Sequence, residues 1–238
     1  MAADDLTAEA LTNALRAESS AAELANVRQR LSPDDEAFGI RMGTLFETAK
    51  HYTGMPLDQV DRLLDHPAYE PRMAAYCVLD FKARRRLSED QRRELYDLYL
   101  RRHDRITTWD MVDRSAPRVV GGYLTGRSKA PLDELAGSND PLRRRTAITA
   151  PLYFVRSGTD DDLADSYLIA GRLAADPEPV VHNAVGIFLK HAGTVDEPTL
   201  VEFLDEHAES MSRAAVRLAA EKLPPDVRQR FVGRRRSA

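Results

Sequence analysis

The sequence is poor in cysteine and in aromatic residues. Its single cysteine among 238 residues, Cys77, excludes an internal disulfide and a zinc site built on cysteines. Cys77 lies in the apolar run MAAYCVLDF, which predicts a buried structural thiol rather than a nucleophile. Aromatic residues make up 7% of the chain, whereas Ala, Leu, Arg, Asp and Glu are abundant. This composition favours helix over strand.

Sequence signals for membranes, metals and nucleotides are also absent. No stretch is long and apolar enough to span a membrane, and the acidic start MAADDLTAEA lacks the basic and apolar regions of a signal peptide. None of the histidines stands in an HxxxH or HxH arrangement with a matching carboxylate, and no P-loop, GxSxG or GxGxxG motif occurs. We therefore expect a cytoplasmic protein that needs no membrane, metal or cofactor.

Basic side chains are concentrated in the middle of the chain. The formal net charge is −4, yet residues 84–156 hold 16 basic and 10 acidic side chains, whereas residues 1–65 hold 6 basic and 12 acidic ones. Local potential governs binding to a polyanion, so this middle part is suited to bind nucleic acid. The alternative is that its arginines only solvate helix faces. The basic clusters are ARRRL, YLRRHDR and PLRRRTA.

Apolar residues recur at intervals of three and four along almost the whole chain, which predicts an all-α protein. Short breakers separate these runs and mark where helices start or stop. One of them leads into the acidic run TDDDLAD, residues 159–165, where carboxylates would complement a helix dipole. The intervals leave room for about a dozen helices of about ten to eighteen residues. The breakers are TGMP, DHPAYEP, RLSEDQ, AGSNDP, RSGTDDD, ADPEP, GTVDEP and KLPPD.

Five of the expected helices resemble one another, each with a polar or Pro-bearing entry followed by small residues. They start at residues 70, 109, 140, 177 and 209, so their offsets are 39, 31, 37 and 32 residues. This spacing is near the period of two-helix repeats such as HEAT or armadillo units. It predicts one domain over residues 1–238, an α-α superhelical solenoid with a concave face and disordered tails at 1–10 and 232–238. Independent helical bundles are the alternative.

The only tryptophan, Trp109, stands four residues before Asp113 in TTWDMVDRSAP, so both share one helical face. A preceding threonine would cap this helix, with Asp110 in its first turn. On spacing alone, the structural interpretation is a core tryptophan beside an aspartate that pairs with an arginine such as Arg114. If the pair faces a groove instead, it is a candidate active site.

The segment TTWDMVDRSAPRVVGGYL resembles the signature helix of the AlkD-like DNA alkylation-repair glycosylases, a family of HEAT-like repeat proteins. The resemblance covers about residues 35–230, in the same order and at compatible spacing, and WDxVDxxAP is its specific part. It implies a monomeric, monofunctional glycosylase of base excision repair, associated with the nucleoid, that acts on double-stranded DNA containing alkylated purines. The other matching segments are YEPRMAAYCVLDF, LRRRTAI, VVHNAVGIFLKH and SRAAVRLAAEKLP.

The resemblance also implies roles for single residues. The aspartate that matches Asp113 is the family's catalytic carboxylate, and the tryptophan that matches Trp109 packs against the deoxyribose of the lesion. The arginine that matches Arg145 contacts the DNA backbone near the lesion. Family members excise purines that carry a positive charge, and they cradle the duplex in the concave face without burying a flipped base. The expected DNA-binding side chains are Arg145, Arg144, Arg143 and Arg114.

The chain departs from the family in the fourth repeat. Family members carry a second tryptophan there, in a run ending GW, whereas this chain has AVGIFLKH with Ile187 in its place. The adjacent Phe188 is turned about 100° away on a helix. We expect both residues at the lesion cleft. The change implies either weaker activity on methyl lesions or a wider cleft for bulky adducts, as in the branch that protects antibiotic producers from yatakemycin-type alkylators.

Two further functional classes stay open at this point. A non-catalytic DNA- or RNA-binding repeat protein would have no need for the carboxylate of WDxVD. A protein-interaction solenoid, the usual role of HEAT arrays, would scatter its arginines over the convex surface. Binding to DNA instead requires the clusters at 84–86, 101–105 and 143–145 to line the groove around Asp113.

Overall fold

The computed structural model describes residues 6–29, 31–33 and 35–233. Within these ranges the regular secondary structure is helical, with one isolated parallel bridge between Glu36 and Ala68. The prediction of an all-α fold is thus confirmed. The chain divides into two compact units, Met1–Val119 (unit 1) and Val120–Ala238 (unit 2). The prediction that they act as a single domain stays a prediction.

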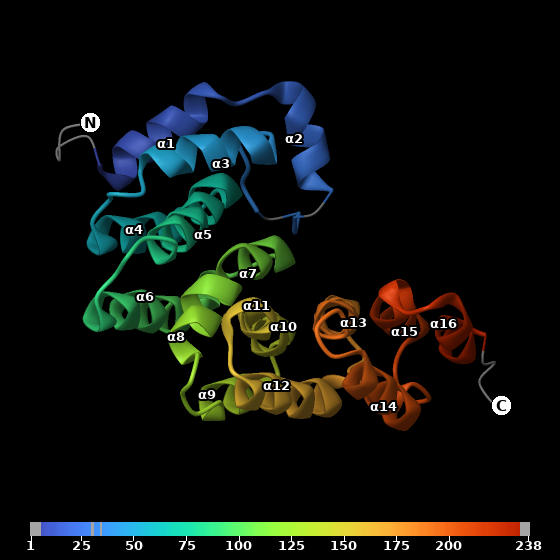
Figure 1. Cartoon of the computed structure of the whole chain (residues 1–238). Helices are drawn as coiled ribbons and strands as arrows, with labels where there is room; N and C mark the ends of the chain where they lie inside the picture. Colours follow the sequence, from blue (N-terminus) through green and yellow to red (C-terminus); the bar gives the residue numbers. More distant parts are fainter. Residues whose placement is uncertain (1–5, 30, 34, 234–238) are drawn as a thin grey trace. The chain divides into compact units, whose positions relative to one another are not determined.

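Unit 1 is built around helix α5, which packs against α3, α4 and α7 (Figure 1). From Tyr69 to Asp80 every residue of α5 except Arg72 is buried, because neighbouring helices cover it on several sides. The helices of unit 1 are α1 (Ala8–Ala17), α2 (Ala21–Arg28), α3 (Met42–His51), α4 (Leu57–Leu64), α5 (Tyr69–Ala83), α6 (Glu89–Arg101) and α7 (Trp109–Ala116), with a 3-10 turn at His103–Arg105.

Unit 2 begins within a π-helical segment, Pro117–Gly121, and stacks α13 between α10 and α15 (Figure 1). Its helices are α8 (Gly122–Leu124), α9 (Ala130–Ala136), α10 (Pro141–Thr149), α11 (Phe154–Ser157), α12 (Asp160–Leu173), α13 (Pro179–Ala192), α14 (Glu197–His207), α15 (Arg213–Ala219) and α16 (Pro225–Val232), with 3-10 turns at Ala150–Tyr153 and Ala220–Lys222.

The five helices that resemble one another in sequence are α5, α7, α10, α13 and α15. Those that follow one another within a unit are packing neighbours: α5 with α7, α10 with α13, and α13 with α15. Small residues allow this close packing. A Cβ atom added to Gly186 on α13 would lie 2.8 Å from the carbonyl oxygen of Ala215 on α15, so only glycine fits there. The repeat predicted from the sequence is therefore present as stacked helices.

The breakers also mark helix starts as predicted. The acidic run after Thr159 begins α12, where the Thr159 and Asp162 side chains form a reciprocal capping box. Helix lengths were overestimated, however. Helices α7 and α16 span 8 residues each. Helix α7 ends at Ala116 because Pro117, which has no N–H to donate, opens the π-helical segment.

Both predicted disordered tails include residues that are helical in the structure. Helix α1 already begins at Ala8, where the Thr7 hydroxyl accepts a hydrogen bond from the backbone N–H of Ala10 at 3.1 Å. Helix α16 continues to Val232. The remaining parts of the predicted tails, residues 1–5 and 234–238, lie outside the described residues.

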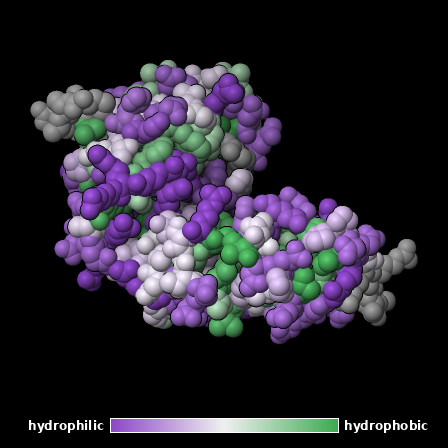
Figure 2. Space-filling view, viewed as in Figure 1, coloured by the Kyte–Doolittle hydropathy of each residue, from purple (hydrophilic) through white to green (hydrophobic). Residues whose placement is uncertain are grey.

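Cys77 is 0% exposed on α5, and burial raises the pKa of its thiol to about 12. The prediction of a buried structural thiol is confirmed. In the described part of the chain no helix combines the length and apolar character needed to cross a membrane. The face in Figure 2 is mostly hydrophilic, with apolar side chains gathered in a few patches.

Candidate functional site

Helix α7 presents a stripe of residues at intervals of four to its outer side. Trp109 is 46% exposed, and Asp113 and Pro117 are half-buried. The opposite side of the helix is buried through Met111, Val112 and other residues. The interpretation of Trp109 as a core residue is therefore wrong. The indole is exposed and Asp113 is half-buried on the same face of α7.

The N-terminal end of α7 is fixed by the buried carboxylate of Asp110. The Tyr69 hydroxyl, at the start of α5, donates a hydrogen bond to Asp110 Oδ2 at 2.6 Å, and the Thr108 hydroxyl donates to Asp110 Oδ1. Thr108 occupies the N-cap position, but its side chain does not cap the helix N–H groups as expected. Its hydroxyl is used on Asp110 instead, so a side-chain contact between helices sets where α7 begins.

The C-terminal end of α7 is fixed by a second aspartate, Asp80 of α5, which is fully buried. Three guanidinium groups surround its carboxylate: Arg84 at 2.8 Å, Arg114 at 3.1 Å and Arg118 at 3.3 Å. A buried carboxylate is stable only when it is paired and hydrogen-bonded, and these arginines meet that need. We call these four residues the Asp80 network.

Sequence reasoning missed the Asp80 network, although a signal was present. Asp80 is the one charged residue inside the apolar run MAAYCVLDF, and a carboxylate in such a run needs cationic partners. Arg114 was expected to bind DNA. Its guanidinium instead pairs with Asp80 and lies over the rings of Phe46 and Phe81, 4.3 Å and 4.6 Å from their centroids. Its contacts are internal, so we assign it a role in holding α7.

Held at both ends, α7 carries Asp113 on a rigid support. The residue before Arg114 in sequence is Asp113, so the contact of Arg114 with Asp80 also restrains the backbone of Asp113. A preorganised carboxylate stabilises a developing positive charge with little reorganisation. The geometry of α7 therefore suits electrostatic catalysis next to an aromatic surface.

The three arginines of PLRRRTA on α10 have different environments. Arg145 is 4% exposed and donates a hydrogen bond to the carbonyl of Val180. Arg144 binds both carboxylate oxygens of Asp176, at 2.6 Å and 3.1 Å. The hydrogen bond to Asp176 raises the pKa of Arg144. Arg143 is half-buried and forms no hydrogen bond or ion pair with the described residues.

These positions change the expected DNA-binding set. Arg145 and Arg144 were expected to reach a DNA backbone, but in this structure both guanidinium groups bind partners within unit 2. Charged side chains are drawn inward here because α10 packs against α13 and a carboxylate and a carbonyl are within reach. Arg143 is the arginine of the three that is available to a phosphate.

The arginines of the cluster YLRRHDR also form ion pairs within unit 1. Arg102 pairs with Asp61 and Asp65 of the α4 region, and these carboxylates, by their charge, raise the pKa of Arg102 against the opposing effect of burial. Arg101 pairs with Asp61 and Arg105 with Asp65. This cluster therefore adds little net positive potential.

The two residues expected at the lesion cleft lie on α13. Phe188 is 0% exposed and makes an edge-to-face contact with Tyr167, with ring centroids 5.8 Å apart. The expectation that Phe188 lines a cleft is wrong, because a helical step turns it into the core of unit 2. Ile187 is half-buried. Asp113 and Trp109 belong to unit 1, whereas Arg143 and Ile187 belong to unit 2, so their meeting in one site stays a prediction.

The His207 Nε2 atom lies 3.7 Å from a carboxylate oxygen of Glu206. In the ranges that the structure describes, no group of three or more His, Cys, Asp or Glu side chains is arranged to hold a metal ion. His66 and His191 are partly buried, and burial lowers the pKa of each imidazole.

Comparison with known proteins gives one family and one fold. The profile of the DNA alkylation repair enzyme family matches residues 11–223. The structure is similar to that of a predicted DNA alkylation repair enzyme from Enterococcus faecalis, with a TM-score of 0.64 and 14% sequence identity over 87% of this chain and 98% of that one. At this identity the likeness shows a shared fold. No curated protein sequence matches the chain.

Proposed function

The chain belongs to the DNA alkylation repair enzyme family, and from this membership we propose that it is a DNA glycosylase for purines made cationic by alkylation at N3 or N7. The proposal rests on the arrangement of residues on the outer face of α7. There an exposed indole and a carboxylate stand one helical turn apart on a helix that is anchored at both ends.

The chemistry of the substrate explains why so few residues suffice. An N3- or N7-alkylated purine carries a positive charge, so it leaves as a neutral base when the bond between its N9 and the sugar C1′ breaks. The electron pair of that bond stays with the base, and no general acid is needed. The positive charge moves to the sugar, which gains oxocarbenium character as in glycoside hydrolysis.

We assign the stabilisation of this charge to Asp113. Its carboxylate would face the sugar as the bond breaks and would hold the water that adds to C1′. The water passes a proton to the Asp113 carboxylate and from there to solvent, and the products are the free base and an abasic site. Preorganised groups of this kind typically contribute about a hundredfold to a thousandfold in rate.

Trp109 would supply the surface on which the sugar rests. The face of an indole attracts a cation, by about 0.5–1 kcal/mol at an exposed site and more where water is excluded. Because the attraction grows as the sugar becomes positive, it favours the transition state over the bound substrate. The lesion would not need to enter a closed pocket, which suits an exposed tryptophan.

DNA would be held mainly through its phosphates. Arg143 is the open cation of the PLRRRTA cluster, and contacts to phosphate position a protein on DNA without reading its sequence. Arg145 and Arg144 would shape α10 from within. In this proposal the duplex is the partner and the protein acts as a monomer, without a cofactor.

Lesion size would be set in part by Ile187, which is smaller than the tryptophan that the resemblance implies at its position. A missing indole leaves more room around the lesion, so bulky N3-adenine adducts would be accepted along with methylpurines. Efficient release of methylpurines together with failure on every bulky adduct would rule out this specialisation.

The experiment incubates the protein with duplex DNA that contains 7-methylguanine and follows freed base by chromatography. We expect the free base and an abasic strand that is intact until treated with alkali. A parallel reaction uses a duplex with a bulky N3-adenine adduct. Binding to both duplexes without release of either base would contradict the proposal and favour a non-catalytic DNA-binding protein.

A further inference from the structure

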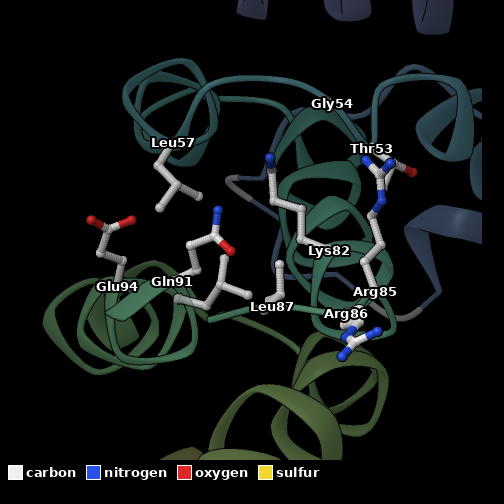
Figure 3. A pocket seen from close by; sticks show the side chains of 10 residues that line it. Thr53, Gly54, Leu57, Lys82, Arg85, Arg86, Leu87, Gln91 and Glu94 are labelled. Carbon is white, nitrogen blue, oxygen red and sulfur yellow. The ribbon is translucent and has the colours of Figure 1, made fainter. Parts of the chain in front are cut away.

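Unit 1 holds a pocket of about 320 Å³ that shares no residue with the Trp109–Asp113 face. It lies between the turn that joins α3 to α4, the end of α5 and the first turns of α6 (Figure 3). We call it the α5–α6 pocket. Its polar lining includes Lys82, Arg85, Gln91 and Glu94. A volume in this range is typical of sites for small ligands.

Three cations line this pocket, Lys82, Arg85 and Arg86, and none of them has an oppositely charged partner among the described residues. The side chains of Lys82 and Arg85 form no hydrogen bond or ion pair with the residues that the structure describes. Burial, and then the charge of Arg85, lower the pKa of the Lys82 ammonium. The other arginine clusters are largely neutralised by aspartates, as Arg102 is by Asp61. This pocket therefore keeps a positive potential that those clusters lose.

The dipole of α5 explains only in part why a cation stands at position 82. Lys82 stands in the last turn of α5, where a cation is favoured. That effect would hold the pKa of Lys82 up, whereas it is lowered. Two cations that repel each other at the mouth of a pocket are stabilised by a bound anion.

The remaining lining is fit to hold an uncharged part of a ligand. The Gln91 Oε1 atom accepts the backbone N–H of Ser88 at 3.0 Å in the capping box of α6, which fixes that side chain. In Figure 3 the amide nitrogen of Gln91 and the ammonium of Lys82 both point toward the turn at Gly54 and Leu57. Glu94 can accept hydrogen bonds from hydroxyl groups, and Leu57 offers an apolar surface.

We propose that the α5–α6 pocket binds a small phosphate monoester that carries hydroxyl groups, such as a sugar phosphate. Lys82 and Arg85 would bind the phosphate oxygens. The Gln91 amide and the Glu94 carboxylate would bind the hydroxyls, and Leu57 would cover the carbon chain. Glu94 disfavours a continuous polyanion at this place, which is why a small ligand is favoured over a DNA backbone. The proposal does not depend on the glycosylase activity.

The test measures binding of ribose 5-phosphate by isothermal titration calorimetry, with ribose and inorganic phosphate as separate probes. We expect saturable binding of ribose 5-phosphate, weaker binding of phosphate and none of ribose. The Lys82→Gln/Arg85→Gln double variant should bind ribose 5-phosphate about tenfold or more weakly, since charge-assisted hydrogen bonds are lost. Arg85→Gln alone, at an exposed position, should weaken binding in the same direction.

The matched control is Arg228→Gln, an exposed arginine of α16 with no ion pair to the described residues. It should bind ribose 5-phosphate as the wild type does. Equal binding by the wild type and the double variant, or no saturable binding at all, overturns the proposal. A titration with undamaged duplex is the third arm. Loss of duplex affinity in the double variant without binding of ribose 5-phosphate also overturns it and assigns these cations to DNA.

Discussion

Helices α7 and α10 are equivalent members of the repeat, yet the residues expected to act on DNA have different environments in the two. On the buried side of helix α7, Asp110 and the Asp80 network connect it to α5. Trp109 and Asp113 lie on its outer face. Helix α10 turns Arg145 and Arg144 toward Val180 and Asp176. Its one open cation is Arg143.

A family motif identifies residues, but the packing of each helix decides which of them reach the surface. A buried charged group needs a partner, so an arginine that binds a carboxylate or carbonyl inside the fold is not available to a ligand at the same time. Helix α7 is anchored through Asp110, Arg114 and the Asp80 carboxylate, while Trp109 is exposed and Asp113 is half-buried. In helix α10, Arg144 and Arg145 bind Asp176 and the carbonyl of Val180 within unit 2.

The largest effect on stability is expected from Asp80→Ala. Removal of a buried carboxylate leaves Arg114, whose side chain is 16% exposed, without its partner. We expect the free energy of unfolding to fall by about 3 kcal/mol, measured by urea denaturation. The control is Asp97→Ala, which breaks the exposed pair with Arg93 and should cost less than about 1 kcal/mol. Equal losses in both variants would show that α7 has no dedicated anchor.

The next prediction compares two neighbours on α10. Arg144→Ala should lower the free energy of unfolding by about 2 kcal/mol, because Asp176 loses its charge-assisted hydrogen bonds. Arg143→Ala should leave stability unchanged. It should instead reduce the slope of log affinity for DNA against log salt concentration by about 1, as expected for one lost phosphate contact. The opposite pattern would reverse the roles assigned to the two arginines.

The smallest predicted effect concerns Trp109 and separates binding from packing. Because Trp109 is 46% exposed, Trp109→Ala should lower the free energy of unfolding less than truncation of a fully buried aromatic residue would. Release of base should slow by about fivefold, which corresponds to the loss of about 1 kcal/mol of cation–π attraction. Leu168→Ala is the matched control, since Leu168 is an apolar side chain that is 74% exposed on α12, and it should change neither quantity. A large loss of stability in Trp109→Ala would return the tryptophan to a structural role.

Much of the fold could be predicted because it depends on local signals. Helical periodicity, breakers that carry Pro or Ser, and the recurrence of small residues all act within one or two turns of the chain. They identified the five stacked helices, the start of α12 and the burial of Cys77. Lengths were less certain, because the end of α7 depends on the π-helical segment that follows Pro117.

The environment of each charge could not be predicted from local signals. Asp80 and Arg114 are 34 positions apart, and only folding brings them within 3.1 Å. Sequence spacing could say that Trp109 and Asp113 share a face, but not whether that face is buried. The same limit affected Phe188, whose contact with Tyr167 places it in the core. Non-local packing decides which member of a charged or aromatic cluster is exposed.

The central claim is that Asp113 serves catalysis while its helix is held by other residues. The most direct measurement compares Asp113→Asn with the wild type in single-turnover release of 7-methylguanine, with the free energy of unfolding and the affinity for DNA measured on the same preparations. We predict release slowed by about a hundredfold or more, with both other quantities nearly unchanged. Release at the wild-type rate would contradict the claim.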